Sequence, residues 1–383
     1  MPEQIGLLTD LTILYLQDNQ LSDLPAEVGL LTQLNTLACH NNRLKYIPRE
    51  IGHCASLQVL TLNKNCLVDV PLELGDCRRL KSVDLKDNPE LAIPAPYVVV
   101  QGPIRACEYF LRLGKVKMVE SLSLDLAKYR LKGFPIELTH MGGYLRELVL
   151  SNNIEIKFLP YEIGELTNLV ILKIEGVKLS GRLTQGLGYL TALEELMLAN
   201  NAIVSIPTGL GTATALRVLD LDRNYVLELP PNDVQAKGYP LNFDFMKRMA
   251  AAERHGGLDL RSLKLSNLDF FKAAVCGHEI QALAEPLERG HPWTHLTALD
   301  LSANRLGQLQ DILGDFVNLK RFKCNGNRLE ALPDAFTRLT ALELLHLADN
   351  AFKEFPGAFF CVACGLCGAR GLRKLLCRDA LFD

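Results

Sequence analysis

The sequence predicts an α/β solenoid, a curved horseshoe of about 13 repeats that share one parallel concave β-sheet. Three observations favour this fold class. Leucine-rich segments recur about every 23 residues, and an asparagine follows each segment's Leu-x-Leu pair at a fixed distance. The pair itself places two side chains on one face of a short strand. A unit of this size cannot bury its apolar face alone, so successive units must stack.

The composition suits such a fold and argues against several function classes. The 383 residues are 48% hydrophobic, which is enough for a large core. The formal net charge is −3, whereas a nucleic-acid binder usually presents a strongly basic face. The same balance argues against an anionic membrane surface as the main partner. The uncharged stretch Pro356–Ala369 is shorter than the roughly 20 apolar residues that span a bilayer. We expect no nucleic-acid partner and no membrane span.

The repeats read L-x-x-L-x-L-x-x-N-x-L-x-x-L-P-x-x-L-G, with substitutions. In an extended strand the paired leucines point inward and the residue between them points outward. We therefore expect the pairs to form the core and the intervening residues to form the concave surface. The first leucines of the copies are Leu11, Leu34, Leu57, Leu80, Leu145, Leu169, Leu193, Leu216, Leu296, Leu319 and Leu342.

An asparagine stands eight residues after the first leucine, where the chain leaves the strand. Backbone groups at this turn are buried and need both a donor and an acceptor, and asparagine carries both on one short side chain. We expect the stacked asparagines to form a hydrogen-bonded ladder. Its members are Asn19, Asn42, Asn65, Asn88, Asn153, Asn201, Asn224, Asn304, Asn327 and Asn350.

A proline stands fourteen residues after the first leucine in many copies. Proline fixes φ and lacks an N–H, so it ends strand-like backbone and favours an extended or single-turn convex side. These prolines are Pro25, Pro48, Pro71, Pro94, Pro207, Pro230, Pro333 and Pro356.

Together these motifs resemble the leucine-rich repeat, and the resemblance covers roughly nine-tenths of the chain. The L-P-x-x-(I/L)-G ending is similar to that of the intracellular, Ras-suppressor-like subclass. This resemblance implies a soluble binding scaffold.

The repeat breaks twice, and the two breaks resemble each other at an offset of 136 residues. Ile104, Cys107 and Leu111 lie at helical spacing, so we expect each break to be a short helix on the edge of the solenoid. Each break is either a tolerated insertion or a hinge or partner-docking element. The matching pairs are Pro94 and Pro230, Val98 and Val234, Gly102 and Gly238, Tyr109 and Phe245, and Arg112 and Arg248.

The predicted organisation alternates repeat blocks with these interruptions. Repeat blocks cover 1–94, 119–230 and 259–360, helical interruptions cover 95–118 and 231–258, and a Cys-rich tail covers 361–383. Neither end reads as the polar cap that a solenoid needs. We therefore expect the chain to be a fragment or one part of a larger protein.

Some segments depart from the consensus. The segment 260–287 is similar to the longer ribonuclease-inhibitor type, with a convex helix around 281–287. Leu179–Leu183 is similar to a plant-type L-S-G-x-I-P segment without its proline, and Val177 replaces the ladder asparagine there. We therefore leave the local curvature of these repeats open.

The cysteines resemble small apolar fillers more than disulfide partners. Cys39 and Cys324 occupy positions where other repeats carry leucine, and Cys54 and Cys77 fall two residues after a glycine, as Leu31 does. The chain also contains no Asn-X-Ser/Thr sequon. Both features favour a reducing, cytoplasmic location.

We expect no enzyme activity, no cofactor and no metal. The chain has no phosphate-binding G-x-x-x-x-G-K-[ST], no G-x-S-x-G and no H-E-x-x-H. His40 and His346 are expected to be solvated on the concave side. The tail from Cys361 to Cys377 has the one metal-like spacing, and it is open to three interpretations: a metal site, an S-acylation site or a structureless tail.

The outward residues between the leucine pairs predict where a partner binds. Their signs are mixed, which does not fit a stripe that tracks phosphates. The column reads Tyr15, Ala38, Thr61, Asp84, Ser123, Val149, Lys173, Met197, Asp220, Lys264, Asp300, Lys323 and His346.

Between 145 and 224 this surface has an apolar centre and a charged rim, which is typical of a protein interface. The alternative is that the apolar members only support strand packing. The predicted partner-binding residues are Val149, Ile171, Lys173, Glu195, Met197, Arg217, Val218 and Asp220. A second, basic cluster is either a solvated face or a site for an acidic segment. Its members are Arg261, Lys264, Lys320, Arg321 and Lys323.

The sequence thus predicts a non-enzymatic scaffold or adaptor that binds a protein partner on its concave face in intracellular signalling. The alternative is a regulatory leucine-rich-repeat module of a larger enzyme, such as a kinase, a phosphatase complex or a GTPase-containing protein. An immune-type sensor ectodomain is a third possibility, and the missing sequons and signal peptide argue against it. The identity of the partner and the oligomeric state are left open.

Overall fold

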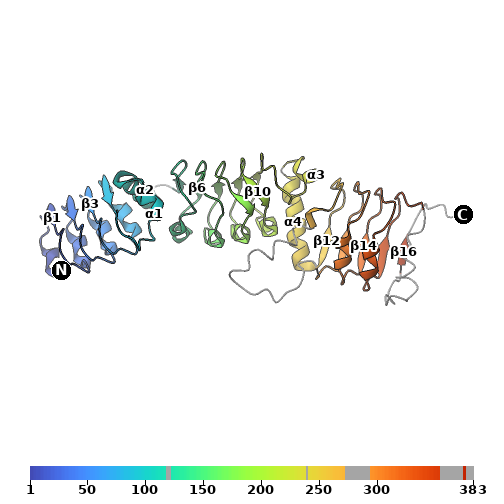
Figure 1. Ribbon diagram of the computed structural model, residues 1–383, viewed down its shortest axis with the longest axis horizontal. Helices are drawn as coiled ribbons and strands as arrows, with labels where there is room; N and C mark the ends of the chain where they lie inside the picture. Colours follow the sequence, from blue (N-terminus) through green and yellow to red (C-terminus); the bar gives the residue numbers. More distant parts are fainter. Residues whose placement is uncertain (118–121, 239, 272–293, 354–373, 377–383) are drawn as a thin grey trace. The chain divides into compact units, whose positions relative to one another are not determined.

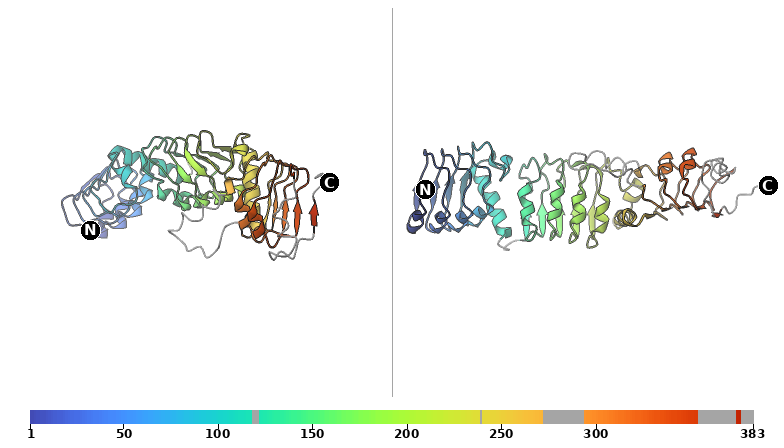
Figure 2. Two further views of the ribbon diagram at one scale, coloured as in Figure 1. Left: turned by 45° about the vertical axis from the view of Figure 1, so that its right-hand side comes forward. Right: turned by 90° about the horizontal axis from the view of Figure 1, so that it is seen from below.

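The computed structural model describes residues 1–117, 122–238, 240–271, 294–353 and 374–376. The chain divides into two compact units, Met1–Lys178 and Leu179–Asp383. In each unit the strands lie along one side of the repeats and short helices along the other (Figure 1, Figure 2). Parallel strands of this kind confirm the predicted α/β leucine-rich-repeat solenoid as the fold class.

In the first unit the strands on each side of the first interruption pair in parallel with their neighbours along the chain, and the last strand before the interruption does not pair with the first strand after it. The register sets Leu37 opposite Leu60, and both side chains are fully buried. The strands before the interruption are β1 (Ile13–Tyr15), β2 (Thr36–Ala38), β3 (Val59–Thr61) and β4 (Ser82–Asp84). The strands after it are β5 (Ser123–Asp125), β6 (Glu147–Val149) and β7 (Ile171–Lys173).

The second unit repeats the arrangement. The plant-like segment contributes β8 (Ser180–Arg182), which pairs with β10 (Ala202–Ser205) in a small separate sheet. Before the second interruption β9 (Glu195–Met197) pairs with β11 (Val218–Asp220). After it a separate five-stranded parallel sheet contains β12 (Gly257–Asp259), β13 (Ala298–Asp300), β14 (Arg321–Lys323), β15 (Leu344–His346) and β16 (Lys374–Leu376). Strand β16 falls within the segment 361–383 that the sequence treats as a tail.

The side opposite the strands consists of single 3-10 turns, as the prolines predict. Pro25, Pro48 and Pro71 are each the extended residue immediately before a turn. The turns of the first unit are η1 (Glu3–Leu7), η2 (Ala26–Leu30), η3 (Arg49–His53), η4 (Leu72–Asp76), η5 (Ile136–Met141) and η6 (Tyr161–Glu165). Those of the second unit are η7 (Gln185–Tyr189), η8 (Thr208–Thr212), η10 (Asp311–Asp315) and η11 (Asp334–Arg338).

The asparagine ladder forms as the sequence predicts. Asn65 Nδ2 donates to the carbonyls of Cys39 and Leu62, both at 3.0 Å, and its Oδ1 accepts from the Leu44 N–H at 3.0 Å. Each such side chain therefore joins its own turn to the preceding repeat. The other asparagines whose Oδ1 accepts from the preceding repeat are Asn42, Asn88, Asn153, Asn201, Asn224, Asn304, Asn327 and Asn350.

Each interruption contains a short helix followed by a long one. The first has α1 (Pro96–Val99) and α2 (Pro103–Lys117), and the second has α3 (Asn232–Gln235) and α4 (Leu241–His255). Ile104 is 65% exposed in the first turn of α2, so the buried face of this helix does not include it.

The two interruptions share their local structure as well as their sequence. Tyr109 and Phe245 are both fully buried. Arg112 and Arg248 each donate to the carbonyl of the last residue of the following strand, Asp125 and Asp259 respectively.

Close backbone contacts fix the long helix of the first interruption. A Cβ added at Gly75 would lie 2.2 Å from the carbonyl oxygen of Phe110, and one added at Gly114 would lie 2.2 Å from the carbonyl oxygen of Gly75. Only glycine at both positions allows α2 to pack so closely on η4. In the second unit a Cβ at Gly211 would lie 2.3 Å from the carbonyl oxygen of Met246 in α4.

Two members of the predicted concave column are wrong. The register sets Asp125, and not Ser123, opposite Val149. It likewise sets Asp259, and not Lys264, opposite Asp300. Both repeats carry a residue other than asparagine at the ladder position, Tyr129 and Leu263, so the motif gave the wrong phase there. The predicted convex helix around 281–287 and the cysteines of the tail lie outside the described residues.

Candidate protein-binding surfaces

The eight predicted partner-binding residues fall in two groups, one in each unit, and none of them is buried. Strands β6 and β7 carry Val149, Ile171 and Lys173 on the first unit. Strands β9 and β11 and the residue before β11 carry the rest, namely Glu195, Met197, Arg217, Val218 and Asp220. The structure describes their positions and leaves their role in binding a prediction.

On the first unit an ion pair crosses this surface. Lys173 Nζ lies 2.8 Å from Glu147 Oε1. The hydrogen bond from Lys173 lowers the pKa of the Glu147 carboxyl, more than partial burial raises it. Val149 pairs with Lys173 and Ile171 pairs with Glu147, so two half-buried apolar side chains alternate with a fixed pair of charges. We call this set, Glu147, Val149, Ile171 and Lys173, the first concave strip.

On the second unit the register sets Glu195 opposite Val218 and Met197 opposite Asp220. Val218 is 38% exposed, and Met197 is half-buried between the buried Leu196 and Leu198. Arg217 Nε lies 3.9 Å from Glu194 Oε2, a long and exposed pair that contributes little to stability. We call the five predicted residues of this unit the second concave strip.

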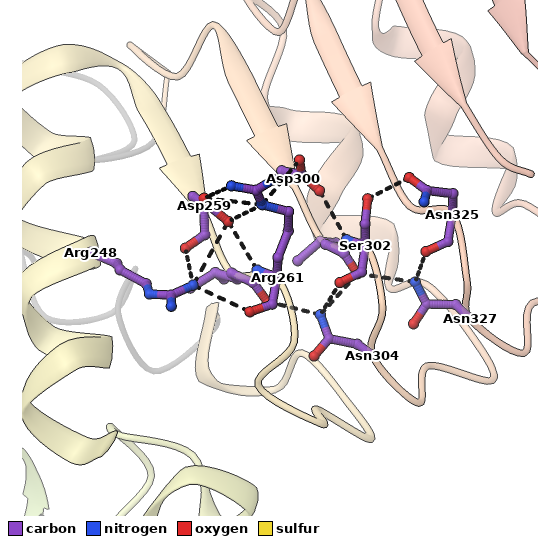
Figure 3. Close-up of polar contacts among 10 residues, drawn as sticks. Arg248, Asp259, Arg261, Asp300, Ser302, Asn304, Asn325 and Asn327 are labelled. Carbon is purple, nitrogen blue, oxygen red and sulfur yellow. Dashed lines mark hydrogen bonds and ion pairs between the residues drawn. The ribbon is translucent and has the colours of Figure 1, made fainter. Parts of the chain in front are cut away.

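The C-terminal strands carry a polar cluster that the sequence reading missed. Arg261 Nη2 lies 2.7 Å from Asp259 Oδ2, and its Nε lies 3.6 Å from Asp300 Oδ2 (Figure 3). Arg248, from α4, donates to the carbonyls of Asp259 and Arg261, each at 3.2 Å. The hydrogen bond from Arg261 holds the pKa of the Asp259 carboxyl below its usual range.

This cluster changes the predicted basic surface. Arg261 is paired with two carboxylates, and Lys264 lies in the turn after β12 with φ +61°. Arg321 and Lys323 remain exposed on β14. The pattern Leu258-Asp259-Leu260 matches Leu299-Asp300-Leu301 in the sequence, and this match was the signal that could have placed Asp259 in the column.

The four cysteines predicted to be apolar fillers, Cys39, Cys54, Cys77 and Cys324, are buried, whereas Cys66 is exposed. Cys54 Sγ donates to the Val28 carbonyl at 3.4 Å, and Cys77 Sγ donates to the Ile51 carbonyl at 3.2 Å. Burial raises the pKa of Cys54 to about 11 and that of Cys77 to about 12. These thiols stay protonated and unreactive at neutral pH, because the thiolate is the nucleophile.

Within the described ranges, His, Cys, Asp and Glu side chains nowhere gather in threes that could hold a metal ion. No helix among the described residues has both the length and the apolar character needed to cross a membrane. The Cys361–Cys377 cluster is outside these ranges.

The leucine rich repeat family model matches residues 294–352. No curated protein matches the sequence.

Several solved structures are similar to this chain at low identity. A leucine-rich-repeat protein of Leptospira interrogans is 22% identical, over 98% of this chain and 80% of that one, with a TM-score of 0.28. An internalin from Listeria monocytogenes is 16% identical, over 91% of this chain and 78% of that one, with a TM-score of 0.21.

The third is the ectodomain of the plant membrane receptor kinase GASSHO1/SCHENGEN3 from Arabidopsis thaliana, in complex with CASPARIAN STRIP INTEGRITY FACTOR 2. It is 22% identical over 94% of this chain, with a TM-score of 0.29. This chain spans 41% of its length.

Proposed function

Because the chain has the leucine-rich-repeat fold and its residues 294–352 match the leucine rich repeat model, we propose that it is a non-enzymatic scaffold or adaptor that binds a protein partner through its concave strands. The leucine-rich-repeat fold is commonly a protein–protein interaction module. We place the contact on the two concave strips, and the process in intracellular signalling, as in the Ras-suppressor-like subclass. The buried thiols of Cys39, Cys54, Cys77 and Cys324 support a reducing, cytoplasmic location.

One observation carries the proposal. In β6, β7 and β9 a buried central leucine lies between two half-buried neighbours, so each strand presents its outer side chains from a fixed backbone. The ladder asparagines hold successive strands in register. Such a surface is ordered before a partner arrives, which reduces the entropy cost of binding.

Affinity capture from native extract tests the proposal, with Met197→Asp and Ile171→Asp compared with the wild type. Each places a charge in the apolar part of a strip, so we expect the captured partner to be depleted by about tenfold or more. Tyr189→Asp is the matched control, since Tyr189 is a 55% exposed aromatic residue in η7, on the side opposite the strands.

Circular dichroism separates binding from folding in this experiment. Wild-type spectra for Met197→Asp and Ile171→Asp together with loss of the partner support the proposal. Equal capture by all four proteins contradicts it. A variant that loses its folded signal would show that its side chain belongs to the core.

A further inference from the structure

A cleft of about 890 Å³ opens in the first unit between the first interruption and the turn after β5. Its size is within the range of sites that take small molecules. On one side it is lined by Pro96, Tyr97, Val100, Gln101 and Arg105, and on the other by Lys128, Arg130, Lys132 and Glu155. We call this the basic cleft. None of the residues of the first or second concave strip lines it.

Hydrogen bonds join the two walls of the basic cleft. The Tyr97 hydroxyl donates to the Gly133 carbonyl at 3.1 Å. Gln101 Nε2 also crosses, donating to the Tyr129 carbonyl at 2.7 Å, and it is held by a second hydrogen bond to the Tyr97 carbonyl of its own wall at 3.0 Å. The walls are therefore held at a set spacing without a ligand, which is the property of a preformed site.

The charge around the cleft differs from that of the whole chain. Four cationic side chains and one carboxylate line it, although the net charge of the protein is −3. Lys128, Arg130 and Lys132 alternate with the buried Tyr129 and Leu131, so all three cations stay at the surface.

Arg105 is positioned on the opposite wall of the cleft. Its guanidinium lies 5.1 Å from the centre of the Tyr129 ring and pairs with Glu108 at 2.9 Å. These contacts restrain the guanidinium at the edge of the cleft.

The second interruption provides an internal comparison. Arg130 and Lys264 are equivalent, at φ +55° and +61°, as are Lys128 and Ser262, at φ +58° and +60°. The tie from Gln101 to the Tyr129 carbonyl reappears as Lys237 Nζ donating to the Leu263 carbonyl at 2.9 Å.

The charges of the second interruption are different. At the position of Tyr97 stands Asp233, whose Oδ2 accepts from both the N–H and the hydroxyl of Ser266 at 2.7 Å. Ser266 is the equivalent of Lys132, and Leu241 is the equivalent of Arg105. The backbone of the interruption therefore does not require the four cations, because the second copy folds in the same way without most of them.

We propose that the basic cleft binds a ligand with clustered phosphate groups, either a soluble polyphosphate or a phosphoinositide headgroup. Guanidinium groups from Arg105 and Arg130 bind phosphate oxygens in pairs, and the ammonium groups of Lys128 and Lys132 add point charges. The wall formed by Pro96, Tyr97 and Val100 accommodates the non-phosphate part of the ligand. This binding is independent of the concave strips.

Isothermal titration of the full chain with inositol hexakisphosphate tests the proposal. We expect one site per chain, with an affinity that falls as salt is added. The test variant combines Lys128→Asn, Arg130→Asn and Lys132→Gln. Asparagine is chosen because Asn41, Asn152 and Asn200 stand at the turn position of Lys128 with φ near that of Lys128. Loss of these charge-assisted hydrogen bonds is expected to weaken binding by at least about tenfold.

Lys264→Asn is the matched control, because it removes the equivalent cation from the second interruption. We expect it to bind inositol hexakisphosphate as the wild type does, and circular dichroism checks that all variants are folded. Equal binding by the triple variant, equal weakening by the control, or no binding by the wild type would overturn the proposal.

Sedimentation with phosphatidylcholine vesicles that contain phosphatidylinositol bisphosphate identifies the source. Cosedimentation that inositol hexakisphosphate abolishes supports a lipid headgroup, and inositol hexakisphosphate binding without cosedimentation supports a soluble ligand. Capture of an acidic peptide with no response to inositol hexakisphosphate would overturn the proposal in favour of a protein segment.

Discussion

Replacing Asn65 by alanine tests whether the ladder, in addition to the leucines, holds the repeats together. Asn65 is 5% exposed and makes hydrogen bonds to Leu44, Cys39 and Leu62. Alanine leaves the buried Leu44 N–H without its partner, which costs about 1–3 kcal/mol, and removes one bond from each of two carbonyls, at about 0.5–1.5 kcal/mol each. We expect the local free energy of opening to fall by about 2–6 kcal/mol.

Asn19→Ala is the matched control. Asn19 occupies the same position in an earlier repeat, where its Nδ2 donates to Leu16 and Gln17 at an exposed site. Water replaces these bonds, so we expect a loss of about 1 kcal/mol or less.

Hydrogen exchange at the Leu44 amide and urea unfolding followed by circular dichroism report local and overall effects. Stacked repeats are stabilised mainly by their neighbours, so exchange should rise around Leu44 first. Similar losses in the two variants, or unchanged exchange at Leu44 in Asn65→Ala, would show that the ladder does not hold the repeats together.

Three further outcomes follow from the packing. Burial raises the pKa of the Glu137 carboxyl more than the 2.7 Å hydrogen bond from Tyr109 lowers it. The protein therefore loses folding stability as the pH rises above 4.5, the usual pKa of this group, and the buried carboxyl ionises. Glu137→Gln should stabilise the fold more at pH 7 than at pH 4 in urea titrations, and a difference independent of pH would contradict this. Gly75→Ala should lower the free energy of unfolding by about 1–3 kcal/mol, because the added methyl group overpacks against α2. Gly133→Ala should lower it far less, since no atom lies within 4 Å of the added Cβ. Equal melting temperatures of the two variants would count against the close contact of Gly75 with α2. Leu198→Asp should unfold adjacent repeats, because Leu198 is fully buried and an unpaired buried charge costs several kcal/mol. Met197→Asp should give the same circular dichroism spectrum as the wild type.

The sequence predicts the regular part of the fold well, because each motif position has one physical task. The stacked leucines and the ladder asparagines are found where their spacing predicts them. Five of the prolines, Pro25, Pro48, Pro71, Pro207 and Pro333, precede 3-10 turns as predicted, whereas Pro94 and Pro230 precede the short helices α1 and α3. The internal offset of 136 residues likewise corresponds to two interruptions with the same local structure, as Tyr109 and Phe245 illustrate.

The irregular repeats could not be read in the same way. With Tyr129 and Leu263 at the ladder position, nothing in the motif fixes the phase, so the predicted column takes Ser123 in place of Asp125 and Lys264 in place of Asp259. The sequence does not predict the basic cleft either. Its two walls, which carry Arg105 and Arg130, meet only through the way the first interruption packs on the following repeat, and no motif specifies that packing. The binding role of the two concave strips remains a prediction.

Photo-crosslinking shows which side of the repeats a partner contacts, and therefore tests whether the strands form the binding surface. A photoreactive phenylalanine analogue replaces Met197 on β9 in one protein and Tyr189 on η7 in another. Each protein is then irradiated in the presence of the captured partner. We expect a covalent adduct from position 197 and none from position 189. An adduct from position 189 alone would contradict a concave binding surface.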